Sequence, residues 1–188
     1  MSGWELVLVL LVLPLLFLGL YLRGLVARLD RLHLRVEATE AVLQARLERR
    51  AALTREVAIE AGLDPVSAVL LIDAATAAQH SDRAGAPRVA AESNLSGALR
   101  AVFGDPETLE ELARDPADRL LLTELAEVTQ GVVLARRFGN DAVRAAVAVR
   151  RRGLVRALRL AGHARWPQSQ DLDDAPPDAL AQFALHSA

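Results

Sequence analysis

An uninterrupted apolar run near the amino terminus constrains this chain more than any other feature. Residues 6–22 read LVLVLLVLPLLFLGLYL and contain no charged side chain. Together with the residues just before it, the run approaches the roughly 20 residues that a helix needs to cross a ~30 Å hydrocarbon core. Trp4 and Tyr21 lie near its two ends, where amphipathic rings favour the headgroup region. Residues 1–22 are therefore predicted to form a short external amino terminus and a transmembrane helix, which Pro14 is expected to kink.

Two other interpretations of this run were weighed against a membrane span. A cleavable signal peptide would have a positively charged segment before the apolar run and a small-residue cleavage site after it, and the sequence has neither. A core helix of a soluble domain is the second alternative. The charges beside the run predict its orientation, because Glu5 precedes it and four arginines follow it at Arg23, Arg28, Arg31 and Arg35. The positive-inside rule then places the rest of the chain in the cytoplasm.

The remainder of the chain has the composition and periodicity of an all-α protein. Leu and Ala dominate while aromatic residues make up only 4% of the chain, which favours helices over sheets. Residues 23–165 are predicted to form an antiparallel bundle of about four helices. The expected helices run to about Ala61, from Pro65 to Asp82, from Val89 to Phe103 and from Arg119 to Gly162, with one or two helical turns between Glu107 and Leu112.

Two of these helices have a continuous apolar seam with spacings of three and four residues. Arg50 and Thr39 are the polar members of the first seam, and Phe138 belongs to the second. The first seam contains Leu29, Leu32, Val36, Leu43, Leu47, Leu53 and Val57. The second contains Leu121, Leu125, Val128, Val132, Ala135, Phe138, Ala142, Ala146 and Val149.

The sequence has no signature of catalysis, of a cofactor site or of a metal site. It contains no cysteine, which excludes disulfides and thiolate chemistry, and its four histidines are scattered without ligand spacing. All 22 basic residues are arginine, and they face 24 acidic residues for a net charge of −2. This balance argues against a globally basic nucleic-acid-binding protein.

The arginines are nevertheless concentrated in one segment. Residues 136–165 contain nine arginines and one acid, and the densest part is expected to continue the last helix as a basic amphipathic segment. Such a segment can bind anionic lipid headgroups, or it can pair with the acidic residues of the tail, Asp171, Asp173, Asp174 and Asp178. Residues 166–188 are interpreted as this acidic, mobile tail. The candidate lipid or partner patch consists of Arg150, Arg151, Arg152, Arg156 and Arg159.

Several short motifs resemble those of the LemA family of bacterial membrane proteins over about residues 4–165. They follow an amino-terminal span and read Leu47-Glu48-Arg49-Arg50, then Glu92-Ser93-Asn94-Leu95-Ser96, then Arg136-Arg137-Phe138-Gly139-Asn140-Asp141. The resemblance implies a single-span protein of the bacterial cell membrane, with its amino terminus outside and an antiparallel helical domain inside. It implies no activity. Gly139 stands where the family usually has Tyr, so the chain resembles a divergent member.

The function expected from the sequence is that of a membrane-anchored helical scaffold, adaptor or membrane-organising protein without catalysis. Its expected partners are the bilayer, anionic headgroups and other membrane or cytoplasmic proteins. The alternatives are a membrane-tethered subunit of an enzyme or of an envelope-stress system, and arginine-mediated binding of nucleic acid, which the lack of interleaved aromatic residues disfavours.

Overall fold

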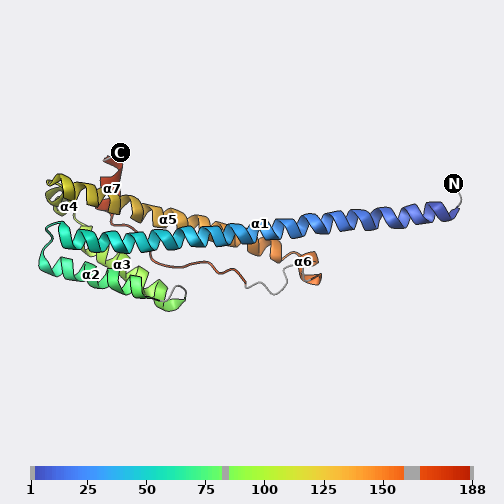
Figure 1. Cartoon of the computed structure of the whole chain (residues 1–188), viewed down its shortest axis with the longest axis horizontal. Helices are drawn as coiled ribbons and strands as arrows, with labels where there is room; N and C mark the ends of the chain where they lie inside the picture. The colour runs from blue at the N-terminus through green and yellow to red at the C-terminus, as the bar shows by residue number, and fades with distance from the viewer. Residues whose placement is uncertain (1–2, 82–84, 159–165, 187–188) are drawn as a thin grey trace. The chain divides into compact units, whose positions relative to one another are not determined.

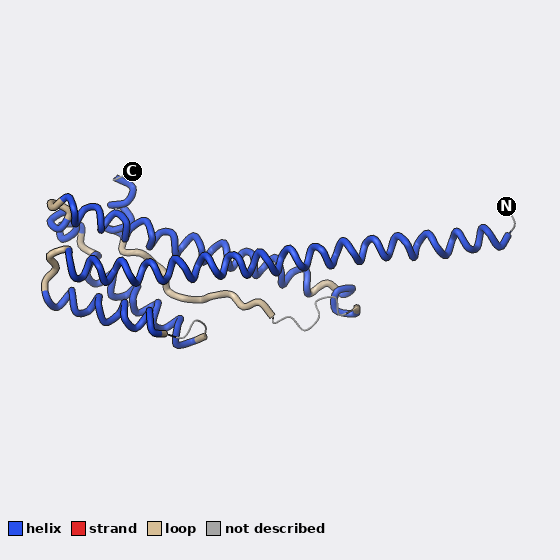
Figure 2. The backbone as a smooth tube through the Cα atoms, viewed as in Figure 1, coloured by secondary structure: helices blue, strands red, loops and turns tan. Residues whose placement is uncertain are grey.

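The computed structural model describes residues 3–81, 85–158 and 166–186, and these are helical or loop, without a strand (Figures 1 and 2). The predicted all-α fold is therefore confirmed. The chain divides into two compact units, one of residues 1–38 and 141–169 and one of residues 39–140 and 170–188. In chain order the helices are α1 (Gly3–Glu60), α2 (Pro65–His80), α3 (Ala86–Phe103), α4 (Pro106–Leu112), α5 (Pro116–Arg150), α6 (Gly153–Ala157) and α7 (Asp178–His186).

The first unit contains the amino-terminal part of α1. Among the described residues, α1 is the one helix that is long and apolar enough to cross a membrane. The large apolar side chains that the structure describes between Trp4 and Tyr21 are exposed, and the first of the described ones to be buried is Leu25. A helix surrounded by lipid needs no protein to cover such side chains, so this exposure is consistent with the predicted span. Leu25 and Leu29 form a small core with Val149 of α5 and Val155 of α6.

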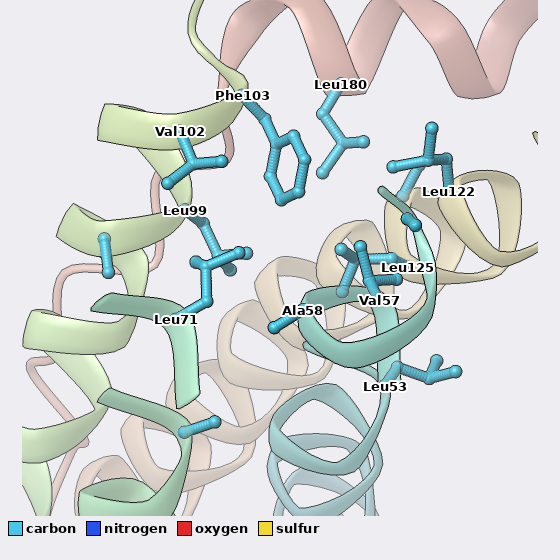
Figure 3. Close-up of a cluster of buried hydrophobic side chains, with 14 of the residues drawn as sticks. Leu53, Val57, Ala58, Leu71, Leu99, Val102, Phe103, Leu122, Leu125 and Leu180 are labelled. Atoms are coloured by element: carbon cyan, nitrogen blue, oxygen red, sulfur yellow. The ribbon is translucent and has the colours of Figure 1, made fainter. Parts of the chain in front are cut away.

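The second unit has the larger core. Buried side chains from α1, α2, α3, α4, α5 and α7 meet in one cluster, part of which Figure 3 shows. α2 packs against α3, and α7 contacts both α3 and α4. The largest apolar side chains of this core cluster include Leu53, Leu71, Leu99, Phe103, Leu125 and Leu180, all of which are fully buried.

Local capping explains where the helices of this unit begin and end. Gly62 takes a positive φ of 56° just after α1, a conformation that favours glycine. The Asp64 carboxylate then accepts the backbone N–H groups of Val66 and Ser67, at 3.0 and 3.1 Å, with Pro65 in the first turn of α2. Asp105 caps α4 in the same manner by accepting from Thr108.

Two expectations about the carboxyl-terminal third require correction. The last long helix was expected to reach Gly162, but α5 ends at Arg150 and the short α6 follows at Gly153. Glycine is a poor helix former and three adjacent arginines repel one another, while Val155 is buried in the small core with Leu25. The tail was expected to be mobile, but it carries α7 and buries Leu180 in the large core.

The seam predicted for α5 is confirmed except at Phe138, whose side chain is 59% exposed. The seam passes through Gly139 instead, where an added Cβ would lie 3.9 Å from Thr39 of α1. The seam of α1 is confirmed as well, including its polar member Arg50, which is fully buried.

Candidate functional site

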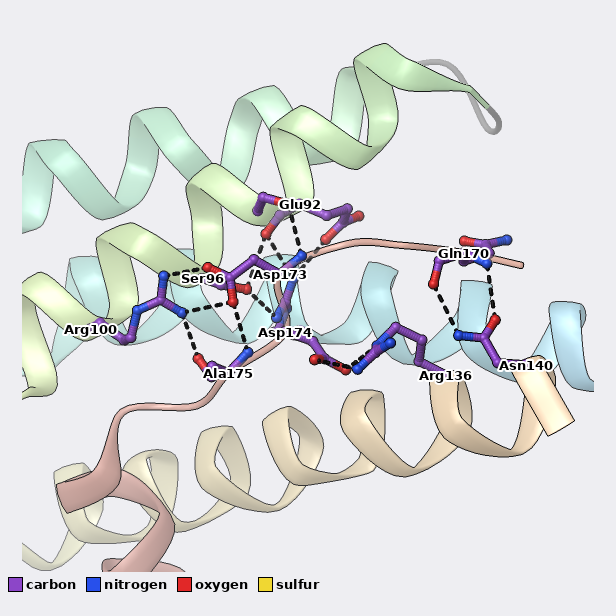
Figure 4. A network of polar contacts seen from close by, with 11 residues as sticks. Glu92, Ser96, Arg100, Arg136, Asn140, Gln170, Asp173, Asp174 and Ala175 are labelled. Atoms are coloured by element: carbon purple, nitrogen blue, oxygen red, sulfur yellow. Dashed lines mark hydrogen bonds and ion pairs between the residues drawn. The ribbon is translucent and has the colours of Figure 1, made fainter. Parts of the chain in front are cut away.

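The second unit encloses a buried arginine cluster formed by Arg50, Arg88, Glu92 and Ser96, of which Figure 4 labels Glu92 and Ser96. Arg50 Nη2 donates to Glu92 Oε2 at 2.9 Å, and its Nη1 donates to Ser96 Oγ at 3.0 Å. Arg88 Nη2 lies 3.1 Å from the other oxygen of the same carboxylate, Glu92 Oε1. Two guanidinium groups thus share one carboxylate, and the local charge is positive.

Burial disfavours the charged form of Arg50 at this position. Loss of hydration lowers the pKa of the Arg50 guanidinium, and the Glu92 carboxylate opposes that shift by its charge and its hydrogen bond. Arg50 Nε is also buried without a hydrogen-bond partner among the described residues. A buried cation needs nearby carboxylates, and Asp174 supplies a second one that acts on Arg50 through its charge.

Asp174 belongs to an extended segment of the tail, residues 170–175, which we call the tail strap. Figure 4 shows the tail strap passing close to α3 and α5. Two carboxylates of the tail strap form two-point ion pairs with arginines of these helices. Asp173 accepts from Arg100 of α3 at 2.6 and 3.2 Å, and Asp174 accepts from Arg136 of α5 at 2.6 and 2.9 Å. Such paired contacts orient both groups as well as neutralising them.

The same helices also hold the backbone of the tail strap. Asn140 accepts the N–H of Gln170 at 3.0 Å through Oδ1 and donates to its carbonyl oxygen at 3.1 Å through Nδ2. Ser93 Oγ accepts the N–H of Asp173 at 3.0 Å, and Arg100 donates to the carbonyl oxygen of Ala175 at 2.8 Å.

Charge explains why acidic residues are found at this place. The helices contribute four arginines to this region, Arg50, Arg88, Arg100 and Arg136, against the single acid Glu92. Asp173 and Asp174 reduce the local net charge from +3 to +1, and the third aspartate of the tail strap, Asp171, acts on Arg136 through its charge. The hydrogen bonds that Arg136 donates to Asp174 raise the pKa of Arg136. Hydrogen bonds from Arg100 in turn hold the pKa of Asp173 below its usual range.

From residue 141 onwards the arginine-rich segment lies in the first unit and has a different environment. Arg151, Arg152 and Arg156 are exposed, and the structure records no ion pair between them and any described residue. We call these three residues the arginine patch. Arg150 is buried instead, and its guanidinium lies over the ring of Trp166 at 4.5 Å from the centroid. Arg159, the fifth predicted member, lies outside the described residues.

The acidic tail therefore has one ion-pair partner inside the arginine-rich run of residues 136–165 and one outside it. Asp174 pairs with Arg136 of that run, and Asp173 pairs with Arg100 of α3. Arg136 and Asn140 are brought to the tail strap, while Arg137 and Phe138 are exposed on α5. Asp141 pairs with Arg144 one turn further along the helix.

Sequence reasoning missed Arg88, Arg100 and Ser93 as members of the site. Arg88 had a local signal, since it precedes Glu92 by four residues on a helix, the spacing of an ion pair. Arg100 had none, because its partner Asp173 lies 73 residues away in sequence.

Within the described ranges no group of three or more His, Asp or Glu side chains is placed to bind a metal ion. Comparisons with protein-family models, with curated proteins and with solved structures found no match. The arrangement therefore has to be interpreted from its own chemistry, which is the recognition of carboxylates by arginine.

Proposed function

We propose that this protein is a membrane-anchored helical scaffold or adaptor that acts by contact and carries no catalytic site. In this proposal α1 crosses a bacterial cell membrane once, with the amino terminus outside and the helical domain in the cytoplasm. The arginines that follow the span support this orientation, because positive charge is retained on the cytoplasmic side.

The observation that carries the proposal is the small core of the first unit. Val155 of α6 is buried together with Leu25 and Leu29 of α1. Leu25 lies three residues beyond the apolar run, which is about 4.5 Å along a helix. The arginine patch is adjacent to Val155 in sequence, so it is held beside the end of the span, at the level expected for lipid headgroups.

Apolar side chains near the arginine patch fit the same environment. Leu158 and Trp166 are about half exposed, and the ring of Trp166 carries Arg150 on one face. Tryptophan and arginine side chains side by side are typical of a membrane interface, where the ring enters the boundary and the cation meets phosphate. Anionic lipid headgroups are therefore the first partner that we propose.

A second surface supports contact with proteins. Val66, Val69 and Leu70 are exposed on neighbouring positions of α2, in the second unit. Exposed apolar side chains grouped in this way are typical of protein contact surfaces. The adaptor role rests on this group together with the lipid contact.

The resemblance to the LemA family remains part of the proposal. Support comes from residues of its three motifs that interact in the second unit. Arg50 of the first motif bonds Glu92 and Ser96 of the second, and Arg136 and Asn140 of the third hold the tail strap beside them. Motif residues that share one buried network have a common reason to occur together.

The lipid contact is tested with the full-length protein in detergent. Native mass spectrometry would count bound phosphatidylglycerol and phosphatidylcholine on the wild type and on the triple variant Arg151→Gln, Arg152→Gln and Arg156→Gln. Each arginine near an anionic surface contributes up to about 1 kcal/mol, so the variant should bind phosphatidylglycerol more than about tenfold more weakly. Added salt should weaken binding to the wild type.

A matched control removes three exposed arginines of the second unit, Arg46, Arg55 and Arg114. This control should bind phosphatidylglycerol as the wild type does, because its substitutions leave the arginine patch intact. Equal loss in both triple variants would mean that only total charge matters, and the specific lipid contact would be rejected.

A further inference from the structure

The tail strap is bound as an extended peptide would be bound by a receptor. Its residues alternate in exposure, with Leu172 and Asp174 buried and Asp171, Asp173 and Ala175 exposed. This period of two is that of an extended chain with one face against a surface. The segment has no helix or strand of its own from residue 166 to residue 177.

Its contacts separate into two kinds with different roles. Asn140, Ser93 and Arg100 bond the backbone of Gln170, Asp173 and Ala175, which any extended peptide could offer. Asn140 satisfies both the N–H and the carbonyl of one residue, so it fixes the direction and register of the peptide. The ion pairs of Arg100 and Arg136 instead recognise the side chains of the peptide, since a two-point contact selects a carboxylate.

We infer that this face of α3 and α5 is a binding site for an extended acidic peptide, occupied in the resting protein by its own tail strap. The site selects an apolar residue followed by two adjacent carboxylates, as in Leu172-Asp173-Asp174. The partner is a segment of another protein with this chemistry, which displaces residues 170–175. The inference rests on the proposed adaptor function and gives it a partner class.

Charge supports an acidic occupant over any other. When the tail strap leaves, Arg100 and Arg136 lose their carboxylates, and the buried Arg50 loses the nearby charge of Asp174. The region then holds four arginines and one glutamate. A replacing segment must restore two negative charges, so neutral or basic peptides do not compete.

The tail is also attached through α7, which follows the tail strap in sequence. This second attachment explains how exchange can be limited to residues 170–175. Ala179 and Leu180 of α7 remain buried in the large core, independently of the polar contacts of residues 170–175. The tail therefore stays attached while its acidic part is exchanged. As a tethered competitor it sets a threshold that a partner has to overcome.

The test uses the full-length protein in detergent and a fluorescein-labelled peptide with the sequence SQDLDDAPP, residues 169–177. Fluorescence anisotropy would compare binding to the wild type and to the variant Asp173→Asn/Asp174→Asn, whose own tail strap has lost the two carboxylates that pair with Arg100 and Arg136. The variant should bind the peptide about tenfold more tightly or better, because a tethered competitor acts at an effective concentration in the millimolar range. Adding Arg136→Gln to this variant should remove binding.

A control peptide, SQDLNNAPP, differs only by having asparagine at the positions of Asp173 and Asp174, and it should not bind either protein. If the variant binds both peptides equally, or binds neither, the inference is wrong. Should the variant lose its helical circular dichroism, hydrogen exchange on the wild type decides instead. Excess acidic peptide should then accelerate exchange at Asp173 and Ala175, and unchanged exchange would reject the inference. Neither readout involves the arginine patch, so failure here is distinct from failure of the lipid contact.

Discussion

The side chains of Arg50 and Glu92 form an ion pair that is closed to solvent, with 0% and 1% exposure and 2.9 Å between Nη2 and Oε2. The second oxygen of Glu92 faces Arg88, so the carboxylate has two cationic partners while each cation depends on the same carboxylate. Removing one partner of a buried pair leaves a charge without compensation, which costs far more than an exposed ion pair contributes. Loss of the carboxylate is therefore expected to cost more than loss of one of the two cations.

Glu92→Gln should destabilise the protein more than Arg50→Met. The first change leaves two buried guanidinium groups without their carboxylate, and we expect it to lower the free energy of unfolding by about 3–5 kcal/mol. The second leaves Glu92 paired with Arg88, so its cost should be smaller. Chemical denaturation followed by circular dichroism in detergent would measure both. An equal or smaller loss for Glu92→Gln would contradict the shared-carboxylate arrangement.

Leu180→Ala should cost as much as a substitution elsewhere in the large core. Leu180 is fully buried there, and truncation of a buried leucine to alanine typically costs about 2–5 kcal/mol. Leu120→Ala is the matched control, because Leu120 is exposed on α5 and should change stability little. Comparison of the two denaturation midpoints tests whether the tail is packed, and similar midpoints would mean that it is not.

The contribution of Asp173 to stability should depend on pH in one direction. Hydrogen bonds from Arg100, aided by the N–H of Ala175, lower the pKa of Asp173 in the folded protein below the unfolded value of about 3.9. Ionised Asp173 therefore stabilises the fold at pH values above the unfolded pKa. The stabilisation is lost as the pH falls through the lower, folded pKa.

The measurement is the difference in free energy of unfolding between the wild type and Asp173→Asn as a function of pH. This difference should be constant from pH 7 to about 5 and should shrink towards zero below about pH 4. A difference that grows on acidification would reverse the sign and disprove the assignment.

Orientation in the membrane can be measured directly, because the chain has no native cysteine. In the proposed orientation, an impermeant maleimide applied to intact cells should label the variant Ser2→Cys and leave Ser187→Cys unlabelled. Lysed cells should label both variants, which controls for reactivity. Labelling of Ser187→Cys alone would place the helical domain outside the cytoplasm and would remove the proposed cytoplasmic partners.

Helices defined by local rules could be predicted from the sequence. The expected starts at Pro65 and Glu107 lie within one residue of those of α2 and α4, which Asp64 and Asp105 cap. The end of α5 was not predicted, because its seam continues to Val149 and the burial of Val155 against Leu25 is a tertiary contact that no local pattern announces. Phe138 was predicted to belong to the seam but is exposed, because the seam passes through Gly139 instead.

The candidate site was predictable only in part. Arg50 was recognised as a polar member of an apolar seam, but its partner Glu92 is 42 residues away and no spacing rule connects them. The acidity of the tail suggested mobility, whereas two of its acids form ion pairs with Arg100 and Arg136, and Leu180 is buried in the large core. Composition states how many charges a segment has, but the fold determines which arginines pair with its acids.

The shared carboxylate of Glu92 also has an evolutionary consequence. A homologue that loses Arg50 can keep Glu92, because Arg88 remains to balance it. A homologue that loses Glu92 would have to lose both arginines in the same step or soon after. Substitution at these three positions should therefore begin with one of the two cations, and the remaining cation and the acid should then be replaced together.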